Sequence, residues 1–560
     1  MTYRNLNDKE IVQLLRQGCR STDWASIEVS EGFSAEDIRN TCFDGSVRIG
    51  AGCHISDVGI IRTTDDATYG EGTIVSVLNE AGDGNIVLYS GLTSQMAALM
   101  VRSRGADTAV WENLKEMTLR EVNSTKATCT TIGNNVSISN TRELTNVVIG
   151  DDCEIAGAAR LVESTLKSTP EASILISDGV ICDSCIIQAG ASVTDNAKLY
   201  NTFVGEACHV GRGFTSENSV FFANSHMDNG EACAALCGPF SVSHHKSTLL
   251  IGGEYSFYNA GSNTNFSNHA YKMGPIHWGT LARGSKTASG AHILWPATTG
   301  AFTMVMGKVQ THPSTPDLPF AYLIAEGQRT MAVPGRNLTT VGTYRDIGKW
   351  QKRDRRPRNG RLSLIQYDWL NPFVAGQCLE ALKTLRRIES ETAAGEETAE
   401  YNGVTMRRTA IATGIGLYEM AVEMALLAAL EQHDASLPAT TAGVGEWTDM
   451  LGMVAPESEV EQLRADIRNE VLTDINDVAE TMKEMHNAYG KYKWAWAYNT
   501  IQRMYGIDTM TEDDRLQLIE RLTPARRKWT DAIRHDAMRE YDMGDVSRDE
   551  LDAFLTKLQD

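Results

Sequence analysis

An aliphatic residue returns about every six positions between residues 132 and 210, and this period constrains the fold more than any other feature of the chain. One run contains Ile181, Ile187, Val193 and Leu199, each six residues after the one before. A spacing of six fits neither the 3.6-residue period of an α-helix nor the simple alternation of a half-buried strand. It is typical of a parallel β-helix, in which short strands separated by turns stack coil upon coil. The sequence therefore predicts a β-solenoid.

Small side chains or cysteines stand four positions after many of these aliphatic residues. Cys208, for example, follows Val204 in this way. We therefore expect such cysteines to be buried and reduced, like small residues of a core. A structural zinc site or a redox pair at Cys182 and Cys185, which form a CxxC sequence, is the alternative.

The six-residue repeat resembles that of the hexapeptide-repeat proteins. The resemblance implies a left-handed parallel β-helix, with the aliphatic residue in the core of a three-sided prism and the small residue at its corner. Many enzymes of that superfamily are acyltransferases that work as trimers, with a catalytic histidine in a cleft between subunits. The resemblance therefore implies a homotrimer for this chain as well.

The repeats and their interruptions divide the 560 residues into four parts. Residues 1–40 contain a short amphipathic helix, which we expect to cap the exposed strand edges of the solenoid. The left-handed β-helix is predicted for residues 41–340, with an insertion at about 79–128. A basic linker occupies residues 341–371, and residues 372–560 have the pattern of an α-helical bundle.

The overall charge and hydropathy narrow the classes of partner. A formal net charge of −20 disfavours general binding to nucleic acids or anionic membranes, because the summed field repels polyanions. We find neither a run of about 18 apolar residues, as a transmembrane helix needs, nor an apolar segment after basic residues at the start. We therefore expect a cytoplasmic protein that binds a small-molecule substrate and neither nucleic acid nor membrane.

Eight of the twelve histidines fall in the stretch 209–312. They are His209, His226, His244, His245, His269, His277, His292 and His312. The coils of a solenoid need small or aliphatic residues inside, so we expect at least two of these histidines to line a functional site.

Acyl transfer is the first chemistry that these histidines suggest. Asn268-His269-Ala270 resembles the Asn-His-Gly element of some hexapeptide acetyltransferases. On this hypothesis His269 or His277 is the general base for attack on an acyl-coenzyme A thioester. Asn268 and nearby backbone amides polarise the acyl oxygen.

Metal binding is the alternative. His226 precedes His244 and His245 by 18 and 19 residues, about one coil, so these three side chains are the predicted ligands. Imidazoles around a divalent transition metal such as Zn²⁺, with water in an open position, form a hydrolytic or lyase site. Such a site resembles that of the gamma-class carbonic anhydrases, which share the solenoid. A non-catalytic scaffold is a third reading.

A cluster of positive charge follows the repeats. Eight lysines and arginines lie within the 17 residues 345–361, in a chain that is otherwise acidic. The guanidinium group of arginine binds phosphate through two parallel N–H donors. We therefore predict a site for a phosphorylated or nucleotide-linked small molecule, and we expect that molecule to be a sugar. The predicted phosphate-binding residues are Lys272, Arg283, Lys286, Arg345, Lys349 and Arg353. The alternative is a solvated linker whose cations pair with acidic helices.

Several later segments resemble a bacterial family catalogued as a domain of unknown function, with hexapeptide-like repeats and a companion helical module. The segments that carry the resemblance are 272–279 (KMGPIHWG), 318–323 (LPFAYL), 334–338 (PGRNL) and 342–350 (GTYRDIGKW). This resemblance implies the architecture and supplies no substrate.

Overall fold

The computed structural model describes residues 2–82, 84–267, 278–544 and 547–558 of the chain, which folds into two compact units. Unit 1 consists of Met1–Trp278, Asp354–Leu364 and Ile467–Val478. Unit 2 consists of Gly279–Arg353, Ile365–Asp466 and Ala479–Asp560. Parts of the predicted basic linker and of the predicted bundle therefore belong to the same unit as the segment Met1–Trp278.

Unit 1 is built on a large parallel β-sheet whose short strands form three ladders. The first ladder runs through β6 (His54–Arg62), β10 (Ser137–Ser139), β12 (Glu154–Ala156), β14 (Leu175–Ser177), β16 (Ser192–Val193), β19 (His209–Gly211), β22 (His226–Asp228) and β25 (Val242–Ser243). The second runs through β11 (Glu143–Ile149), β13 (Arg160–Leu166), β15 (Ile181–Ile187), β18 (Phe203–Val204), β21 (Val220–Phe221), β24 (Leu236–Cys237) and β27 (Gly253–Tyr255). The third begins where β15 also pairs with β17 (Lys198–Tyr200). It continues through β20 (Thr215–Glu217), β23 (Glu231–Cys233), β26 (Leu249–Ile251) and β28 (Asn265–Ser267).

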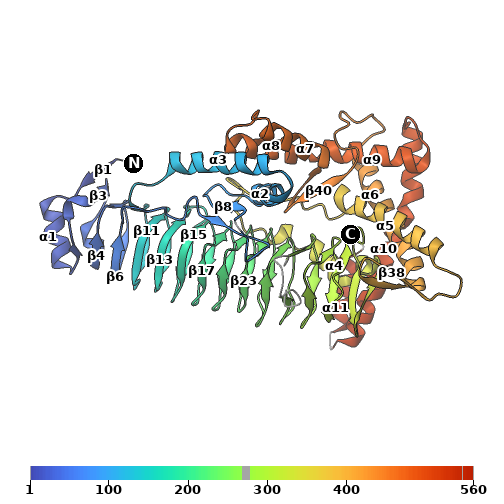
Figure 1. Cartoon of the computed structure of the whole chain (residues 1–560), viewed down its shortest axis with the longest axis horizontal. Coiled ribbons are helices and arrows are strands. Elements are labelled where there is room, and N and C mark those ends of the chain that lie inside the picture. The colour runs from blue at the N-terminus through green and yellow to red at the C-terminus, as the bar shows by residue number, and fades with distance from the viewer. Residues whose placement is uncertain (1, 83, 268–277, 545–546, 559–560) are drawn as a thin grey trace. The chain divides into compact units, whose positions relative to one another are not determined.

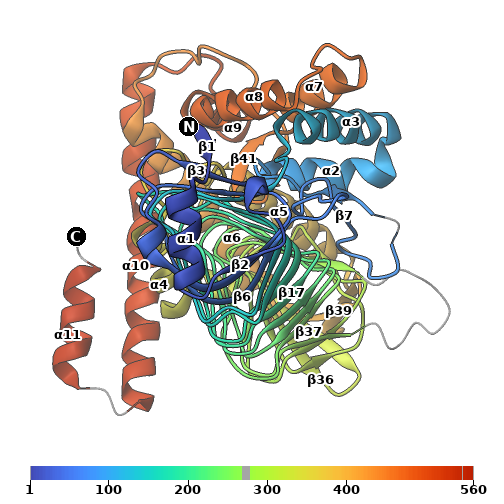
Figure 2. The ribbon, with the colours of Figure 1, turned by 90° about the vertical axis from the view of Figure 1, so that its left-hand side faces the viewer.

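The strands follow one another along unit 1 from β4 (Ile38–Asp44) to β23 (Figure 1). Seen along this row, successive turns of the chain overlie one another (Figure 2). The arrangement is a solenoid-like β-fold, as the six-residue period predicts.

The core of the first ladder is a column of aliphatic side chains held in register. Ile138 pairs with Ile55 and Ile155, and the column continues through Ile176, Val193, Val210 and Met227. Each of these side chains is at most 1% exposed. Because side chains alternate between the two faces of a strand, the residues on either side of each column member point outward. The outer face of this ladder therefore carries the polar groups.

In the run from Ile181 to Leu199, the six-residue period misplaces its first core residue by one position. Cys182 pairs with Leu161 and Leu199 and is fully buried, whereas Ile181 is only half-buried. The strand register places the core position one residue later than a strict period of six.

The cysteines lie mostly inside the protein. All eleven lie in the described part of the chain, none of them forms a disulfide, and nine are buried. Burial raises the pKa of the Cys153 and Cys208 thiols to about 12, so these thiols stay protonated.

Two helices and a hairpin interrupt the first coils, and a helix precedes them. The hairpin pairs β7 (Ile74–Val75) with β8 (Ile86–Val87), and the helices are α2 (Ser94–Ala106) and α3 (Thr108–Thr125). At the N-terminus α1 (Asp8–Arg16) begins with a capping box between Asn7 and Glu10, followed by strands that join the sheet.

Unit 2 begins with shorter parallel pairings and continues with helices. β30 (Lys286–Thr287), β33 (Met304–Met306) and β36 (Tyr322–Glu326) pair in parallel, and β37 (Arg329–Val333) then turns back antiparallel to β36. The main helices are α4 (Val341–Ile347), α5 (Pro372–Glu391), α6 (Arg408–Gln432), α9 (Tyr489–Tyr505) and α10 (Glu512–Met543). The expected helical C-terminal region is thus present.

Helix α6 is long and apolar enough to cross a membrane by length and composition. Its side chains pack against α5, α9 and α10, and 56% of its most apolar window is buried. This burial is also what the central helix of a bundle requires.

The segment 354–364 is held on unit 1 by buried charge. The carboxylate of Glu206 accepts hydrogen bonds from the backbone N–H groups of Leu362 and Ser363, both at 2.9 Å. Arg356, whose side chain is 2% exposed, lies 3.5 Å from Glu206 and 3.0 Å from Asp354. Part of the basic linker is therefore an internal ion-pair network.

Glu206→Ala is expected to lower the free energy of unfolding by about 3–5 kcal/mol, because it breaks a buried ion pair and two hydrogen bonds. Urea denaturation of the first cooperative transition measures the change. Glu217→Ala is the control, since Glu217 is an exposed glutamate on the same sheet and its loss should cost under about 0.5 kcal/mol. Equal losses in the two variants would contradict the assignment.

Candidate metal centre

His209, His226 and Asp228 are brought together by the register of the first ladder. His209 on β19 pairs with His226 on β22, and Gly211 pairs with Asp228. Val210 and Met227 lie between them in the core column, so His209, His226 and Asp228 are on the outward face. The two histidines are stacked because they occupy the same position in successive coils.

The three side chains converge through their polar atoms. The Nε2 atom of His209 lies 3.2 Å from Oδ1 of Asp228, and the Nε2 atom of His226 lies 2.9 Å from Oδ2. One ligand atom from each side chain lies within 4.8 Å of the others. The two imidazole rings are 4.7 Å apart, centroid to centroid. Three potential ligand atoms this close together could bind one cation.

Asp228 is the most buried member of the group. Its side chain is 2% exposed, against 29% for His209 and 44% for His226. Oδ1 of Asp228 forms no hydrogen bond with any residue that the structure describes, since its contact with His209 lacks hydrogen-bond geometry. A buried carboxylate oxygen without a hydrogen-bond donor costs about 1–3 kcal/mol, so a further group that binds Oδ1 would stabilise Asp228.

His209 is oriented and kept neutral by its surroundings. Its Nδ1 atom lies 2.8 Å from the hydroxyl of Ser192, one coil earlier, and this contact turns Nε2 toward Asp228. Burial and the neighbouring His226 lower the pKa of His209, against the opposing effect of Asp228. The neutral imidazole is the form that binds a metal.

Gly211 keeps the space between these groups open. A Cβ atom at this position would lie 2.7 Å from Oγ1 of Thr194, 2.8 Å from Nε2 of His209 and 3.1 Å from Oδ1 of Asp228. A side chain at this position would therefore press against these three polar atoms, and glycine leaves them facing one another.

His244 and His245 lie next to this group. The rings of His226 and His244 are 5.8 Å apart, and those of His244 and His245 are 4.2 Å apart. Burial and the charges of His245 and His226 lower the pKa of His244. Of the three predicted ligands, His226 is thus in the converging group and the other two border it.

His209 and Asp228 are not among the ligands predicted from the sequence. The spacing between His209 and His226 was a usable signal, because it equals one coil. Asp228 lies two positions after His226, so both share the outward face.

The residues predicted for acyl transfer, His269, His277 and Asn268, lie outside the described residues, as does Lys272. Arg283 is placed in the interior of unit 2, where its side chain is 1% exposed. Its guanidinium donates to Asp449 at 2.9 Å and to the carbonyls of Gln366 and Gly452. Arg283 therefore supports the fold of unit 2 and does not face solvent, contrary to its predicted role as a phosphate ligand.

Other predicted phosphate ligands do come together in unit 2. The ammonium groups of Lys286 and Lys349 both contact the carboxylate of Asp346. Burial lowers the pKa of each lysine to about 8, and nearby cations, among them Arg345, contribute to the shift.

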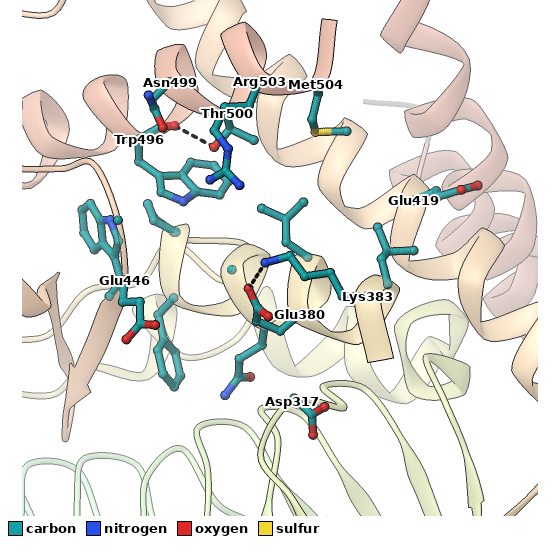
Figure 3. Close-up of a pocket in the computed structure, with 18 of the residues that line it drawn as sticks. Asp317, Glu380, Lys383, Glu419, Glu446, Trp496, Asn499, Thr500, Arg503 and Met504 are labelled. Carbon is teal, nitrogen blue, oxygen red and sulfur yellow. Dashed lines mark hydrogen bonds and ion pairs between the residues drawn. The ribbon is translucent and has the colours of Figure 1, made fainter. Parts of the chain in front are cut away.

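A pocket of about 900 Å³ lies among the helices of unit 2 (Figure 3). Trp496 and Arg503 line it from α9, and Glu380 and Lys383 line it from α5, where they form an ion pair at 2.6 Å. Acidic and basic side chains are mixed along its walls. Among the residues that the structure describes, the converging group of potential metal ligands is in unit 1, so this pocket is the weaker candidate for a metal-dependent site.

Comparison with known proteins matches two family models to most of the chain. Residues 3–53 and 46–389 match a domain of unknown function, DUF4954, and residues 431–548 match another, DUF6819. An uncharacterized protein of Treponema pallidum (strain Nichols) is 24% identical over 391 residues, which cover 58% of this chain and 53% of that protein. The chain spans about half the length of this curated relative.

Proposed function

The chain belongs to the DUF4954 family, and we propose that it is a metal-dependent hydrolase or lyase whose divalent cation is held by His209, His226 and Asp228. The family name carries no reaction, so the proposal stands on the site. The observation that supports it is the convergence of two imidazole Nε2 atoms on a buried carboxylate with an orphan oxygen.

Zinc is the metal that this donor set suits best. Two imidazoles and a carboxylate are the protein ligands of many catalytic zinc sites, and they leave a position for water. A bound Zn²⁺ lowers the pKa of that water to about 7, which makes a hydroxide nucleophile available near neutral pH. Iron(II) also accepts two histidines and a carboxylate, so metal analysis must identify the ion.

Neighbouring side chains extend this chemistry. His244 is 5.8 Å from His226, ring to ring, and its lowered pKa suits a proton acceptor for the bound water. Arg212 lies 3.6 Å from Asp228 and is 66% exposed, so its charge favours an anionic substrate at the same face. A small anionic substrate is therefore part of this proposal.

The finer description of the fold is part of the same proposal. Three parallel ladders joined by turns support a hexapeptide β-helix, and its left hand is proposed from the resemblance to the hexapeptide-repeat proteins. We infer a homotrimer by analogy with such proteins. The half-exposed His209 and His226 leave the site accessible on the outer face.

Acyl transfer from acyl-coenzyme A and a non-catalytic scaffold role stay predictions. The base and the oxyanion group of the acyl-transfer hypothesis lie among residues that the structure does not describe. A scaffold gives no reason for a buried carboxylate between two histidines.

Untagged protein prepared without chelator is expected to contain about one zinc per chain. Asp228→Ala and His226→Ala should each lose it, because each removes a ligand. Inductively coupled plasma mass spectrometry measures the content. His54→Ala is the matched control, since His54 is an exposed histidine on the same ladder. Metal-free protein that is folded, or metal retained in Asp228→Ala, would overturn the proposed site.

Ser192→Ala is expected to weaken zinc affinity by about 10–100-fold, because the hydroxyl orients the ring of His209. Competition with a chromophoric chelator measures the dissociation constant. Ser137→Ala alters the same column of the ladder away from the site and should leave the affinity unchanged. If both variants bind zinc like the parent chain, Ser192 has no role in positioning the ligand.

Hydrolysis of p-nitrophenyl acetate and hydration of carbon dioxide are suitable first assays, since both report a metal-bound hydroxide. Gly211→Ala should reduce either rate at least about 100-fold while the circular dichroism spectrum is unchanged, since the methyl group fills the ligand space. Zinc-loaded protein that is inactive in both assays would separate metal binding from hydrolytic function.

A further inference from the structure

Unit 2 contains a second cluster of charged side chains, where β30 contacts the end of α4. Lys286 begins β30, Asp346 lies in the last turn of α4, and Lys349 follows shortly after the end of that helix. Both ammonium groups reach the same carboxylate. The side chains of Lys286, Asp346 and Lys349 are 21%, 8% and 31% exposed, so all three are largely removed from solvent.

The charges of this cluster do not balance. One carboxylate faces two ammonium groups, and Arg345 and Arg353 add two more positive charges close enough to act on the lysines. Burial and mutual repulsion lower the pKa of Lys286 and Lys349 to about 8. Like charges held together out of water are costly unless a counter-ion accompanies them.

Asp536, a buried acidic residue on the packed helix α10, is already engaged. Asp536 lies 3.0 Å from Arg336 and 3.4 Å from Arg539, and it accepts a hydrogen bond from the backbone N–H of Val341. It therefore does not neutralise the lysine pair. The excess of positive charge around Asp346 is an arrangement that a multivalent anion completes.

We propose that Lys286, Lys349, Arg345 and Arg353 form a binding site for the phosphate group of a small molecule, with Asp346 as its internal counter-ion. Lysine supplies point charges and arginine supplies forks, and both are characteristic ligands of phosphate. The chain's net charge of −20 disfavours a polyanion such as nucleic acid as the source of that phosphate. The site shares no residue with the proposed metal centre, so evidence against that centre would not count against this site.

Asp346 has a distinctive role in this proposal. It holds the two lysines in place when no ligand is bound, and it repels an incoming phosphate. Removing its charge should therefore strengthen anion binding, whereas a purely structural ion pair predicts only loss of stability. This opposite sign separates the two explanations.

Isothermal titration calorimetry of the full chain with inorganic pyrophosphate, at pH 7 and low ionic strength, tests the site. We expect one site per chain, at least about tenfold weaker binding in Lys286→Met and Lys349→Met, and tighter binding in Asp346→Asn. Lys308→Met is the control, because Lys308 is an exposed lysine on β34 (Lys308–Val309), another strand of unit 2 that does not pair with β30. Circular dichroism verifies that each variant is folded.

The absence of binding in both the parent chain and Asp346→Asn would overturn the proposal, and so would equal weakening by Lys308→Met. If Asp346→Asn does not fold, the two lysine variants still decide the matter. Orthophosphate and sulfate, titrated in parallel, should compete with pyrophosphate and bind more weakly, because each carries less charge.

Sulfate binding is expected to weaken as the pH rises through about 8, because Lys286 and Lys349 lose their protons there while Arg345 and Arg353 stay charged. Sulfate keeps a constant charge over this range, so the ligand does not contribute to the change. Titrations at pH 7.0 and 9.5 should differ at least about tenfold in affinity. Equal affinity at the two values would exclude the lysines as the titrating ligands.

Discussion

The parallel pairing of each short strand with the strand one coil away determines the environment of the side chains on the three ladders of unit 1. Val193, Val210 and Met227 share one buried column because they are partners in this register, although they belong to different coils of the chain. The same register stacks Ser192, His209 and His226 on the outer face. A coil cannot bury its apolar face alone, so packing and site assembly depend on the same stacking.

The buried positions of the strands could be predicted from the sequence, because an apolar residue recurs at the same place in each coil. Ile155 and Val193 are where the period of six places them, and Cys208 fills a small buried position. Cys182 departs from the count because the structure keeps register between coils and not a fixed interval along the chain. A periodicity finds the core, and only strand pairing fixes each position.

The outward-facing positions could be predicted only in part. The histidine-rich region was identified from composition, but His209 and Asp228 needed the register to be seen beside His226. Contacts between distant segments leave no local signal at all, as when Arg283 meets Asp449 and Lys286 of β30 meets Asp346 of α4. The composition of the basic stretch therefore could not show which of its arginines are buried in ion pairs, as Arg356 is, and which lie in the charged cluster around Asp346.

Asp228 is the group whose burial needs an explanation. Its Oδ2 atom has Nε2 of His226 at hydrogen-bond distance, so that oxygen has a partner. Oδ1 faces the space that Gly211 leaves open, and the approach of His209 does not supply a hydrogen bond there. A purely structural role would be served as well by an apolar residue, since polar groups buried without full partners destabilise a fold. The proposed cation, held by His209, His226 and Asp228, would remove this deficit. The cost of burying the carboxylate and the capacity to bind a metal are, on this argument, two consequences of one arrangement.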